Sequence, residues 1–363
     1  MTRPPHERAT ARLGAIRRVA AAHGAPAALV THLPAIRWAV GFSGSNGALL
    51  VTPTRAHLVT DGRYREQAAA EVAVAEVHVP GYRLFEHMAE QGLLEGAAPL
   101  VVQADALTVA QYVHLERTFE GTPLVAVTEL LAVAIAQRDA ALVAQIAEAQ
   151  ARTARVLEDV LALVRPGVTE RELAAEIVYR HLRAGASAMA FEPIVASGPN
   201  GARPHARPTD RRLAAGDLVV LDMGGVFEGV CADLTRTVAL GEPGAAARRA
   251  YEAVREAKAA AIAAVRAGVS GAFLERTARD VLARYGLEAH FAHSLGHGVG
   301  YEIHEWPRLS QQVDHVLPGG ATVTIEPGVY LEGRFGIRIE DVVVAEAGGA
   351  RNLTPLSDAL IVL

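Results

Sequence analysis

The first third of the chain alternates short apolar runs with stretches of helical spacing. One helical stretch, residues 63–74, lies between two of these runs. Strands that alternate with helices are typical of a layered α/β domain, which we expect to occupy residues 1–132. The runs that we expect to form its strands are residues 27–30, 48–51, 56–59 and 100–102.

A long Ala-rich helical stretch, residues 138–164, begins the second part and ends at an Arg-Pro-Gly stop signal. Thr169 and Glu172 then have the spacing of a capping box at the start of the next helix. The sequence VRPGVT at 164–169 is similar to VRAGVS at 265–270, and each lies between a long and a shorter helix. This repeat predicts a duplicated domain with a pseudo-two-fold axis. Chance similarity in an Ala-, Arg- and Val-rich chain is the alternative.

From residue 213 onward the pattern changes to strands with Gly-rich turns, separated by two helices. We expect antiparallel strands to carry the unusual charges of this part, so that residues 133–363 form an α+β domain. The expected strands lie within residues 217–238, 322–330 and 336–344, and the expected helices are residues 245–267 and 270–285.

Composition and charge narrow the class of protein. Hydrophobic residues are 51% of the 363, which excludes a mainly disordered chain. The net charge of −5 leaves no basic excess for phosphate backbones, so we expect no nucleic-acid partner. No segment has the roughly 18 unbroken apolar residues of a membrane span, and arginines interrupt any signal-peptide core near the start. Cys231 is the only cysteine, which fits a reducing compartment, and we expect a cytoplasmic protein.

A predicted hairpin within residues 218–240 carries two aspartates on one face. Two apolar runs flank a Glu-Gly pair that suits a two-residue turn. With that turn, Asp222 faces Thr235, and Asp233 lies diagonally from Asp222, with Cβ atoms roughly 7 Å apart. Carboxylates this close in an apolar sheet repel each other, so one holds a proton or cations lie between them. Two exposed aspartates are the alternative, against which the apolar run before Asp222 argues.

The same pattern recurs in two later strands. Glu326 interrupts an apolar strand, and Arg338 and Glu340 share one face of another, opposite two isoleucines. Taken alone, the second of these strands is equally typical of a surface strand with an ordinary ion pair.

Three glycines within residues 293–300 indicate a loop or bulged strand that brings backbone close to a site. His293, His297 and His304 fall within a dozen residues, which favours a functional role over a structural one. His304 also begins a segment that superficially resembles a zinc-protease HExxH helix. It lacks the second histidine, and Pro307 would break the helix, so we reject that interpretation.

Four carboxylates and one imidazole form a hard, oxygen-rich ligand set. Such a set favours two divalent cations, Mn²⁺ in the first place, with Co²⁺ or Zn²⁺ also suitable. Two cations roughly 3.5 Å apart lower the pKa of a shared water and polarise a carbonyl under attack. The chemistry therefore points to metal-assisted hydrolysis.

These residues, in this order, resemble the metallopeptidase family with the pita-bread fold, which contains methionine aminopeptidases, Xaa-Pro aminopeptidases and Xaa-Pro dipeptidases. The resemblance implies that Asp233 and Glu340 bridge the two cations and that Asp222 chelates one of them. It also implies that Glu326 handles the proton of the attacking water. The metal ligands that the resemblance implies are Asp222, Asp233, His297, Glu326 and Glu340.

Two further residues resemble the family's supporting positions around the ligands. Thr235 matches a threonine that supports the site, and Arg338 matches an arginine beside the metal carboxylates.

Residues 196–209 resemble the segment that the proline-specific branch has ahead of its first aspartate. This implies that His205 lies beside the substrate, and that His293 and His304 bind substrate and stabilise the oxyanion. Arg308 matches a position that binds the C-terminal carboxylate of the substrate in some prolidases, a task that suits its fork of donors. An exposed, solvated Arg308 is the alternative.

Residues 41–64 resemble the creatinase-like N-terminal domain of this branch, which methionine aminopeptidases lack. The resemblance also implies a homodimer. The predicted substrates are proline-containing di- or oligopeptides. We expect an Xaa-Pro dipeptidase first, because the N-terminal domain is short and Arg308 is present, and an Xaa-Pro aminopeptidase second. A non-catalytic binding module and a creatinase-like hydrolase of small C–N compounds are the remaining alternatives.

Overall fold

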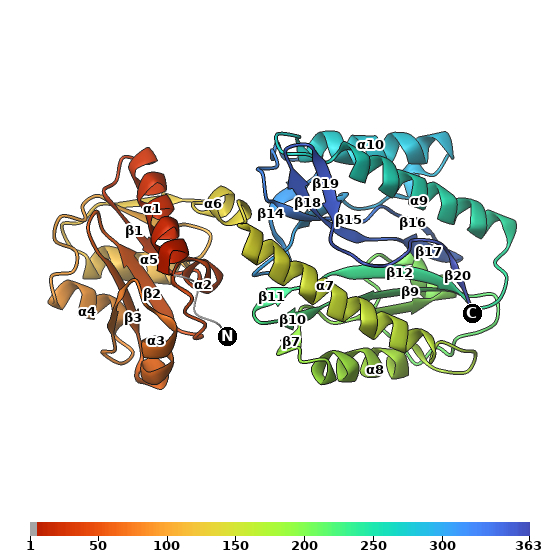
Figure 1. Ribbon diagram of the computed structural model, residues 1–363, viewed down its shortest axis with the longest axis horizontal. Coiled ribbons are helices and arrows are strands. Elements are labelled where there is room, and N and C mark those ends of the chain that lie inside the picture. The colour runs from red at the N-terminus through yellow and green to blue at the C-terminus, as the bar shows by residue number, and fades with distance from the viewer. Residues whose placement is uncertain (1–5) are drawn as a thin grey trace. The chain divides into compact units, whose positions relative to one another are not determined.

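The computed structural model describes residues 6–363, which divide into two compact units (Figure 1). The first unit ends at Ile135, and the second begins at Ala136. The boundary expected after residue 132 falls at the start of helix α6 (Ala132–Ala136), where the division occurs.

The first unit is built on a six-stranded mixed sheet with strand order β4-β3-β2-β1-β5-β6. The four predicted strands are present as β1, β2, β3 and β5. The two edge strands, β4 and β6, were not predicted, because they are only partly buried and therefore lack an unbroken apolar run. The strands are β1 (Ala27–Val30), β2 (Gly47–Val51), β3 (Ala56–Thr60), β4 (Glu76–His78), β5 (Leu100–Gln103) and β6 (Leu124–Val127).

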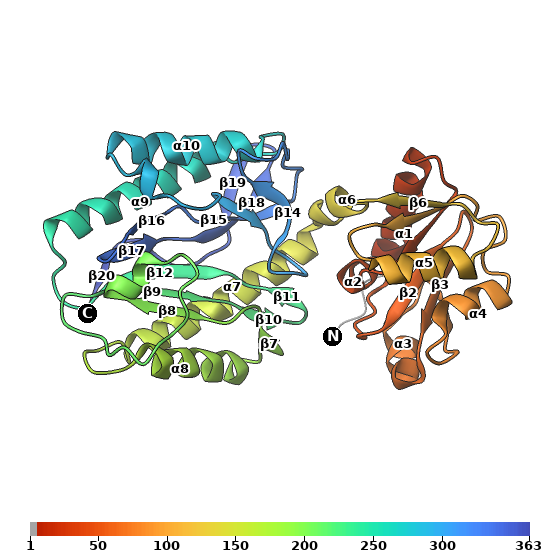
Figure 2. The ribbon, with the colours of Figure 1, turned by 180° about the vertical axis from the view of Figure 1, so that it is seen from behind.

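Helices cover both faces of this sheet, with α1 on one face and α4 and α5 on the other (Figures 1 and 2). The helix expected over residues 63–74 is shorter, because a 3₁₀ turn precedes it. Leu84, Met88 and Leu115 of α4 and α5 pack in one core cluster with strand residues such as Val59. The helices are α1 (His6–Ala22), α2 (Leu33–Val40), α3 (Arg65–Glu71), α4 (Leu84–Glu90) and α5 (Val109–Thr118).

The second unit has two similar halves, each a sheet covered by a pair of helices (Figure 1). In the first half α7 (Ala140–Leu161) and α8 (Glu170–Arg183) cover a sheet of β8 (Ile194–Ser197), β9 (Leu218–Met223), β12 (Leu234–Ala239) and β20 (Ile361–Val362). In the second half α9 (Ala245–Ala264) and α10 (Gly271–Arg284) cover a sheet of β13 (Gly296–Gly298), β14 (Glu305–Leu309), β15 (Thr322–Ile325), β18 (Asp341–Glu346) and β19 (Gly349–Asn352). The smaller strands are β7 (Ala188–Met189), β10 (Gly225–Phe227), β11 (Val230–Cys231), β16 (Gly328–Leu331) and β17 (Phe335–Arg338).

The repeat seen in the sequence has the same backbone structure in both halves. Gly167 and Gly268 have φ angles of 91° and 86°, and each donates its N–H to a leucine carbonyl over 2.8 Å. Thr169 then caps α8, with the predicted capping box, and Ser270 caps α10. Each cap residue also forms an isolated antiparallel bridge. The duplication is therefore structural and not a coincidence of composition.

The predicted hairpin register is confirmed. In the pairing of β9 with β12, Asp222 lies opposite Thr235. The turn residues Glu228 and Gly229 have φ angles of 49° and 80°, as a two-residue turn of the primed type requires.

Each of the two later strands is interrupted at a predicted metal ligand. β15 ends at Ile325, and Pro327 then separates it from β16, since proline supplies no N–H to a ladder. β17 ends at Arg338 and β18 begins at Asp341, so that Glu340 lies between the two strands. The apolar pattern alone did not reveal these breaks.

The only lysine of the chain, Lys258 on α9, is buried in an ion cluster around Asp341. Lys258 Nζ donates to Asp341 Oδ2 over 2.5 Å, and Arg236 Nη2 donates to Asp341 Oδ1 over 2.8 Å. Each of the three residues is at most 2% exposed. Their charges therefore compensate one another away from water.

Asp341→Ala is expected to lower the free energy of unfolding by about 3–5 kcal/mol, because two buried cations lose the anion that they share. Lys258→Met should cost less, since Arg236 still neutralises Asp341. Thermal unfolding followed by calorimetry measures both effects, with Asp358→Ala at the more exposed rim of the cluster as the control. An Asp341→Ala protein that melts with the wild type would contradict this account.

No helix within residues 6–363 is both long and apolar enough to cross a membrane.

Candidate metal centre

Three buried carboxylates meet where β9, the start of β12 and the β17–β18 break come together. One oxygen from each of Asp222, Asp233 and Glu340 lies within 4.8 Å of the others. The three residues are 7%, 5% and 2% exposed. Gln150 on α7 fixes the backbone of Asp233 from both sides, because its amide donates to the Asp233 carbonyl and accepts from the Asp233 N–H.

His297 and Glu326 adjoin this group on the side of Asp233. His297 Nε2 lies 3.3 Å from Glu326 Oε1 and 3.6 Å from Asp233 Oδ2. The other ring nitrogen, Nδ1, is 3.1 Å from the Gly298 carbonyl, a contact that requires an N–H at Nδ1 and directs Nε2 toward the carboxylates. The strand carrying His297 has a register shift at this residue, as the glycine-rich sequence predicted. The structure thus brings all five predicted ligands together.

Burial and crowding disfavour the charged forms of the three clustered carboxylates. Burial raises the pKa values of Asp222, Asp233 and Glu340, and at Asp233 the charge of Glu340 adds to the effect. Burial alone would also raise the pKa of Glu326, but its hydrogen bond with His297 lowers it. The site concentrates negative charge that protein groups only partly compensate.

Two carboxylate oxygens show that this donor set fits divalent cations. Within residues 6–363, Asp222 Oδ1 and Glu340 Oε1 are buried and have no hydrogen-bond partner. An unpaired buried carboxylate oxygen is costly, and a hard cation satisfies it directly. Asp233 lies between Asp222 on one side and the His297–Glu326 pair on the other, so the donors suit two adjacent cations.

Arg338 and Thr235 hold the carboxylates in place. Arg338 Nη2 donates to Asp222 Oδ2 over 2.5 Å, and Thr235 Oγ1 donates to Glu340 Oε2 over 2.7 Å. Arg338 Nε also lies 3.4 Å from Thr235 Oγ1. The pairing of Arg338 with a buried ligand excludes the ordinary surface ion pair that the sequence left open.

A tyrosine that the sequence analysis did not single out links Arg338 to His293. Tyr330 Oη accepts from Arg338 Nη1 over 2.7 Å and lies 2.9 Å from His293 Nε2. Because His293 Nδ1 contacts the Ser294 carbonyl over 2.8 Å, Nδ1 carries the N–H and Tyr330 donates to Nε2. Burial raises the pKa of Tyr330, which keeps this donor protonated. A tyrosine at a strand end has no distinctive sequence signal.

Tyr330→Phe is expected to lower kcat by about 10–100-fold, because the ring of His293 loses the hydrogen bond that orients it. Steady-state kinetics with a peptide substrate measures the change. Tyr285→Phe is the matched control, since its hydroxyl bonds Glu256 on α9, outside this network. Equal losses in both variants would show that Tyr330 has no special role.

Glu170, which the sequence analysis also passed over, organises the segment that carries His205. Its buried carboxylate accepts from the backbone and hydroxyl of both Ser197 and Thr209, and from Asn200. The loop between these residues passes close to the metal ligands, because Arg338 Nη1 donates to the Pro204 carbonyl over 3.0 Å. His205, the next residue, is exposed.

The remaining predicted residues lie at the exposed side of the centre. The rings of His304 and His297 are 4.3 Å apart, edge to face. Burial and then the charge of His297 lower the pKa of His304, and Arg308 and His205 act in the same direction. Arg308 is exposed and lies opposite His297 in the β13–β14 register. His205, His304 and Arg308 therefore carry polar groups near the ligands without belonging to them.

The HExxH interpretation is excluded by the structure as well. Residues from Glu305 onward form strand β14 and not a helix, and the Glu305 carboxylate pairs with Arg138.

Comparisons with known proteins give two family matches. Residues 144–347 match Metallopeptidase family M24, and residues 12–134 match the Creatinase/Prolidase N-terminal domain.

Proteins similar over nearly the whole chain carry related names. The Uncharacterized peptidase YqhT of Bacillus subtilis is 32% identical over 335 residues, which are 92% of this chain and 95% of that protein. A solved Xaa-Pro dipeptidase from Bacillus anthracis superposes with a TM-score of 0.94 at 31% identity, covering 98% of this chain and 100% of that one. A solved X-Pro aminopeptidase from Thermotoga maritima gives a TM-score of 0.88 at 31% identity, covering 95% and 100%.

Proposed function

Since the chain belongs to metallopeptidase family M24, we propose that it hydrolyses Xaa-Pro peptide bonds as an Xaa-Pro dipeptidase. The two family matches confirm the predicted architecture, a creatinase-like α/β domain followed by a pita-bread catalytic domain. Membership also makes the chain a metal-dependent exopeptidase. The observation that carries the proposal is the cluster of four carboxylates and one imidazole, with two buried oxygens that lack partners.

The residues that would hold two divalent cations are Asp222, Asp233, His297, Glu326 and Glu340. Mn²⁺ is our first choice, because four of the five donors are carboxylates, with Co²⁺ or Zn²⁺ as the other candidates. When bound, such cations supply Lewis acidity to water and to the scissile carbonyl.

The protein groups around these ligands supply proton transfer and charge stabilisation. Glu326 accepts the proton of the attacking water, since the neighbouring imidazole of His297 favours its ionised form. His293 and His304 offer ring nitrogens on the same side as Glu326, where they stabilise the developing oxyanion. His205, exposed on the loop held by Glu170, contacts the substrate beside them.

Arg308 decides between the two exopeptidase activities in this proposal. Its exposed guanidinium lies close enough to His304 to affect the pKa of that histidine, and it can pair bidentately with the free carboxylate of a dipeptide. Longer peptides have no carboxylate at that position. The similarity to a solved X-Pro aminopeptidase keeps cleavage of longer peptides as the second candidate.

Xaa-Pro dipeptides are expected to be cleaved with a higher kcat/KM than Xaa-Pro-Yaa tripeptides after the protein is loaded with manganese. Arg308→Leu should raise KM for dipeptides about 10–100-fold, because a charge-assisted pair is lost, and should leave tripeptides nearly unchanged. Arg351→Leu, at the opposite edge strand of the same sheet, is the control. Faster cleavage of tripeptides by the wild type would replace the dipeptidase with the aminopeptidase.

A non-catalytic module and a metal-independent hydrolase remain as outcomes of a simpler test. Both would leave purified protein without bound divalent metal and without activation when metal is added. The presence of all five ligand types in one cluster disfavours them.

Three further features belong to the proposal. The homodimer rests on the resemblance of the N-terminal domain to that of the proline-specific branch, and the cytoplasmic location rests on the single cysteine. The absence of a basic excess supports a peptide partner over nucleic acid, and we propose no membrane partner.

A further inference from the structure

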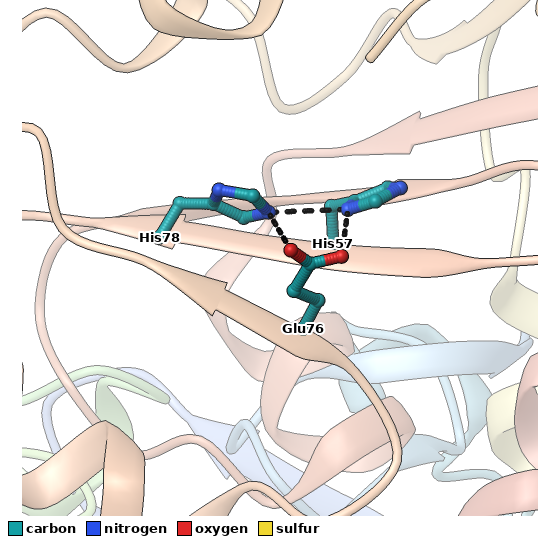
Figure 3. Close-up of side chains that lie close together, drawn as sticks. All are labelled: His57, Glu76 and His78. Atoms are coloured by element: carbon teal, nitrogen blue, oxygen red, sulfur yellow. Dashed lines mark hydrogen bonds and ion pairs between the residues drawn. The ribbon is translucent and has the colours of Figure 1, made fainter. Parts of the chain in front are cut away.

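A second group of metal-ligating side chains lies in the first unit, on the sheet edge formed by β3 and β4. Figure 3 shows His57, Glu76 and His78 directed toward one another. One ligand atom of each lies within 4.8 Å of the others. Neither the metal centre of the second unit nor the proposed function uses these residues.

The strand register brings the three side chains together. β3 and β4 are parallel, with His57 opposite Glu76 and Val59 opposite His78. Residues two apart on a strand share a face, so His57, Glu76 and His78 all lie on one face of the sheet. This is the face that α4 covers, because Val59 packs with Leu84 of that helix. The sequence separation of the histidines concealed the group, since neither residue forms a recognisable motif alone.

The distances between the ligand atoms are those of a tetrahedral site. His57 Nδ1 lies 3.1 Å from His78 Nε2, and these nitrogens lie 3.5 and 3.7 Å from the two oxygens of Glu76. Ligands bound to zinc at its usual bond lengths of 2.0–2.2 Å are about 3.3 Å apart around a tetrahedron. A cation between these atoms would need little movement of the side chains.

The surroundings favour neutral imidazoles and leave a route for an ion. Burial, and next the neighbouring His78, lower the pKa of His57, and burial lowers that of His78. Neutral imidazole is the form that binds a metal. The side chain of Glu76 is 58% exposed, so solvent reaches the group. On the far side of His78, its Nδ1 lies 3.4 Å from His87 Nε2 on α4, a contact of the kind that orients ligating histidines.

We propose that His57, Glu76 and His78 bind one divalent transition-metal ion, with Zn²⁺ preferred, and that this ion fastens the edge strand β4 to β3. Two nitrogens and one carboxylate oxygen suit zinc better than the oxygen-rich centre of the second unit does. Water completes the coordination. The competing arrangement is a hydrogen bond between the two imidazoles without an ion, and the experiment below separates the two.

The test measures bound zinc in the full-length chain, stripped with chelator and then dialysed against buffered Zn²⁺. An Asp233→Asn background removes most binding at the metal centre, so that the second site is counted alone. In that background the proposal expects about one equivalent of zinc and an upward shift of the melting temperature of at least about 2 °C. Adding His78→Gln or Glu76→Gln should abolish both.

His114→Gln is the matched control, because His114 Nε2 also lies near a carboxylate, 3.4 Å from Glu86, but without a second imidazole. It should keep the zinc and the thermal shift. Glu76→Gln keeps the test valid if a histidine variant folds poorly, since Glu76 is largely exposed. Equal zinc content with and without His78→Gln or Glu76→Gln would overturn the proposal and leave a hydrogen-bonded histidine pair. Failure of the peptidase assay would not affect this result.

Discussion

Asp233→Asn is expected to lower kcat on the order of 10³-fold and, at the same time, to raise the melting temperature of the metal-free protein. The loss of activity follows because Asp233 lies between the two groups of ligands and is the carboxylate that both would share. The gain in stability follows because one of three crowded, buried negative charges is removed. The amide of Gln150 still holds the backbone of residue 233, so the local fold persists.

Two measurements check this pair of effects. Metal analysis and kinetics after manganese loading give the first, and calorimetry in the presence of chelator gives the second, with a rise of at least about 3 °C expected. Asp210→Asn, on an exposed aspartate paired with Arg171, should change neither. A metal-free Asp233→Asn protein less stable than the wild type would show that the carboxylates do not repel one another as the geometry implies.

Arg338→Met is expected to lower kcat/KM on the order of 10²-fold and to destabilise the metal-free protein by about 3–5 kcal/mol. The guanidinium donates to Asp222, to Tyr330 and to the Pro204 carbonyl. Its removal leaves a buried carboxylate unpaired and loosens both the His293 contact and the loop before His205. Arg338→Lys should restore part of the stability but little of the activity, because an ammonium cannot reproduce three directed bonds.

Arg334→Met is the matched control for this prediction. Arg334 is exposed in the connection between β16 and β17, a few residues from Arg338. Its loss should change neither kcat/KM nor stability. Activity of Arg338→Met within twofold of the wild type would remove Arg338 from the supporting network.

The metal ligands could be predicted from the sequence because each breaks a strong local rule. Asp222 follows an unbroken apolar run, and Glu326 interrupts one, so burial of the charge could be inferred without coordinates. The hairpin turn fixed the register of Asp222 against Thr235. Such violations of pattern are what functional residues in strands look like in a sequence.

The supporting residues could not be predicted in this way. Tyr330 and Glu170 occupy positions where a tyrosine and a glutamate are ordinary, at a strand end and in the first turn of a helix. Their roles depend on side-chain hydrogen bonds to residues 8 to 39 positions away. The group around His57 was hidden for a related reason, since the pairing of an unpredicted edge strand brings it together.

The central claim is that five side chains of the second unit hold a pair of cations. The most direct measurement is an anomalous difference map from crystals of the manganese-loaded protein. We predict two adjacent peaks enclosed by Asp222, Asp233, His297, Glu326 and Glu340. A map without peaks among these side chains, or with manganese bound only elsewhere, would contradict the account.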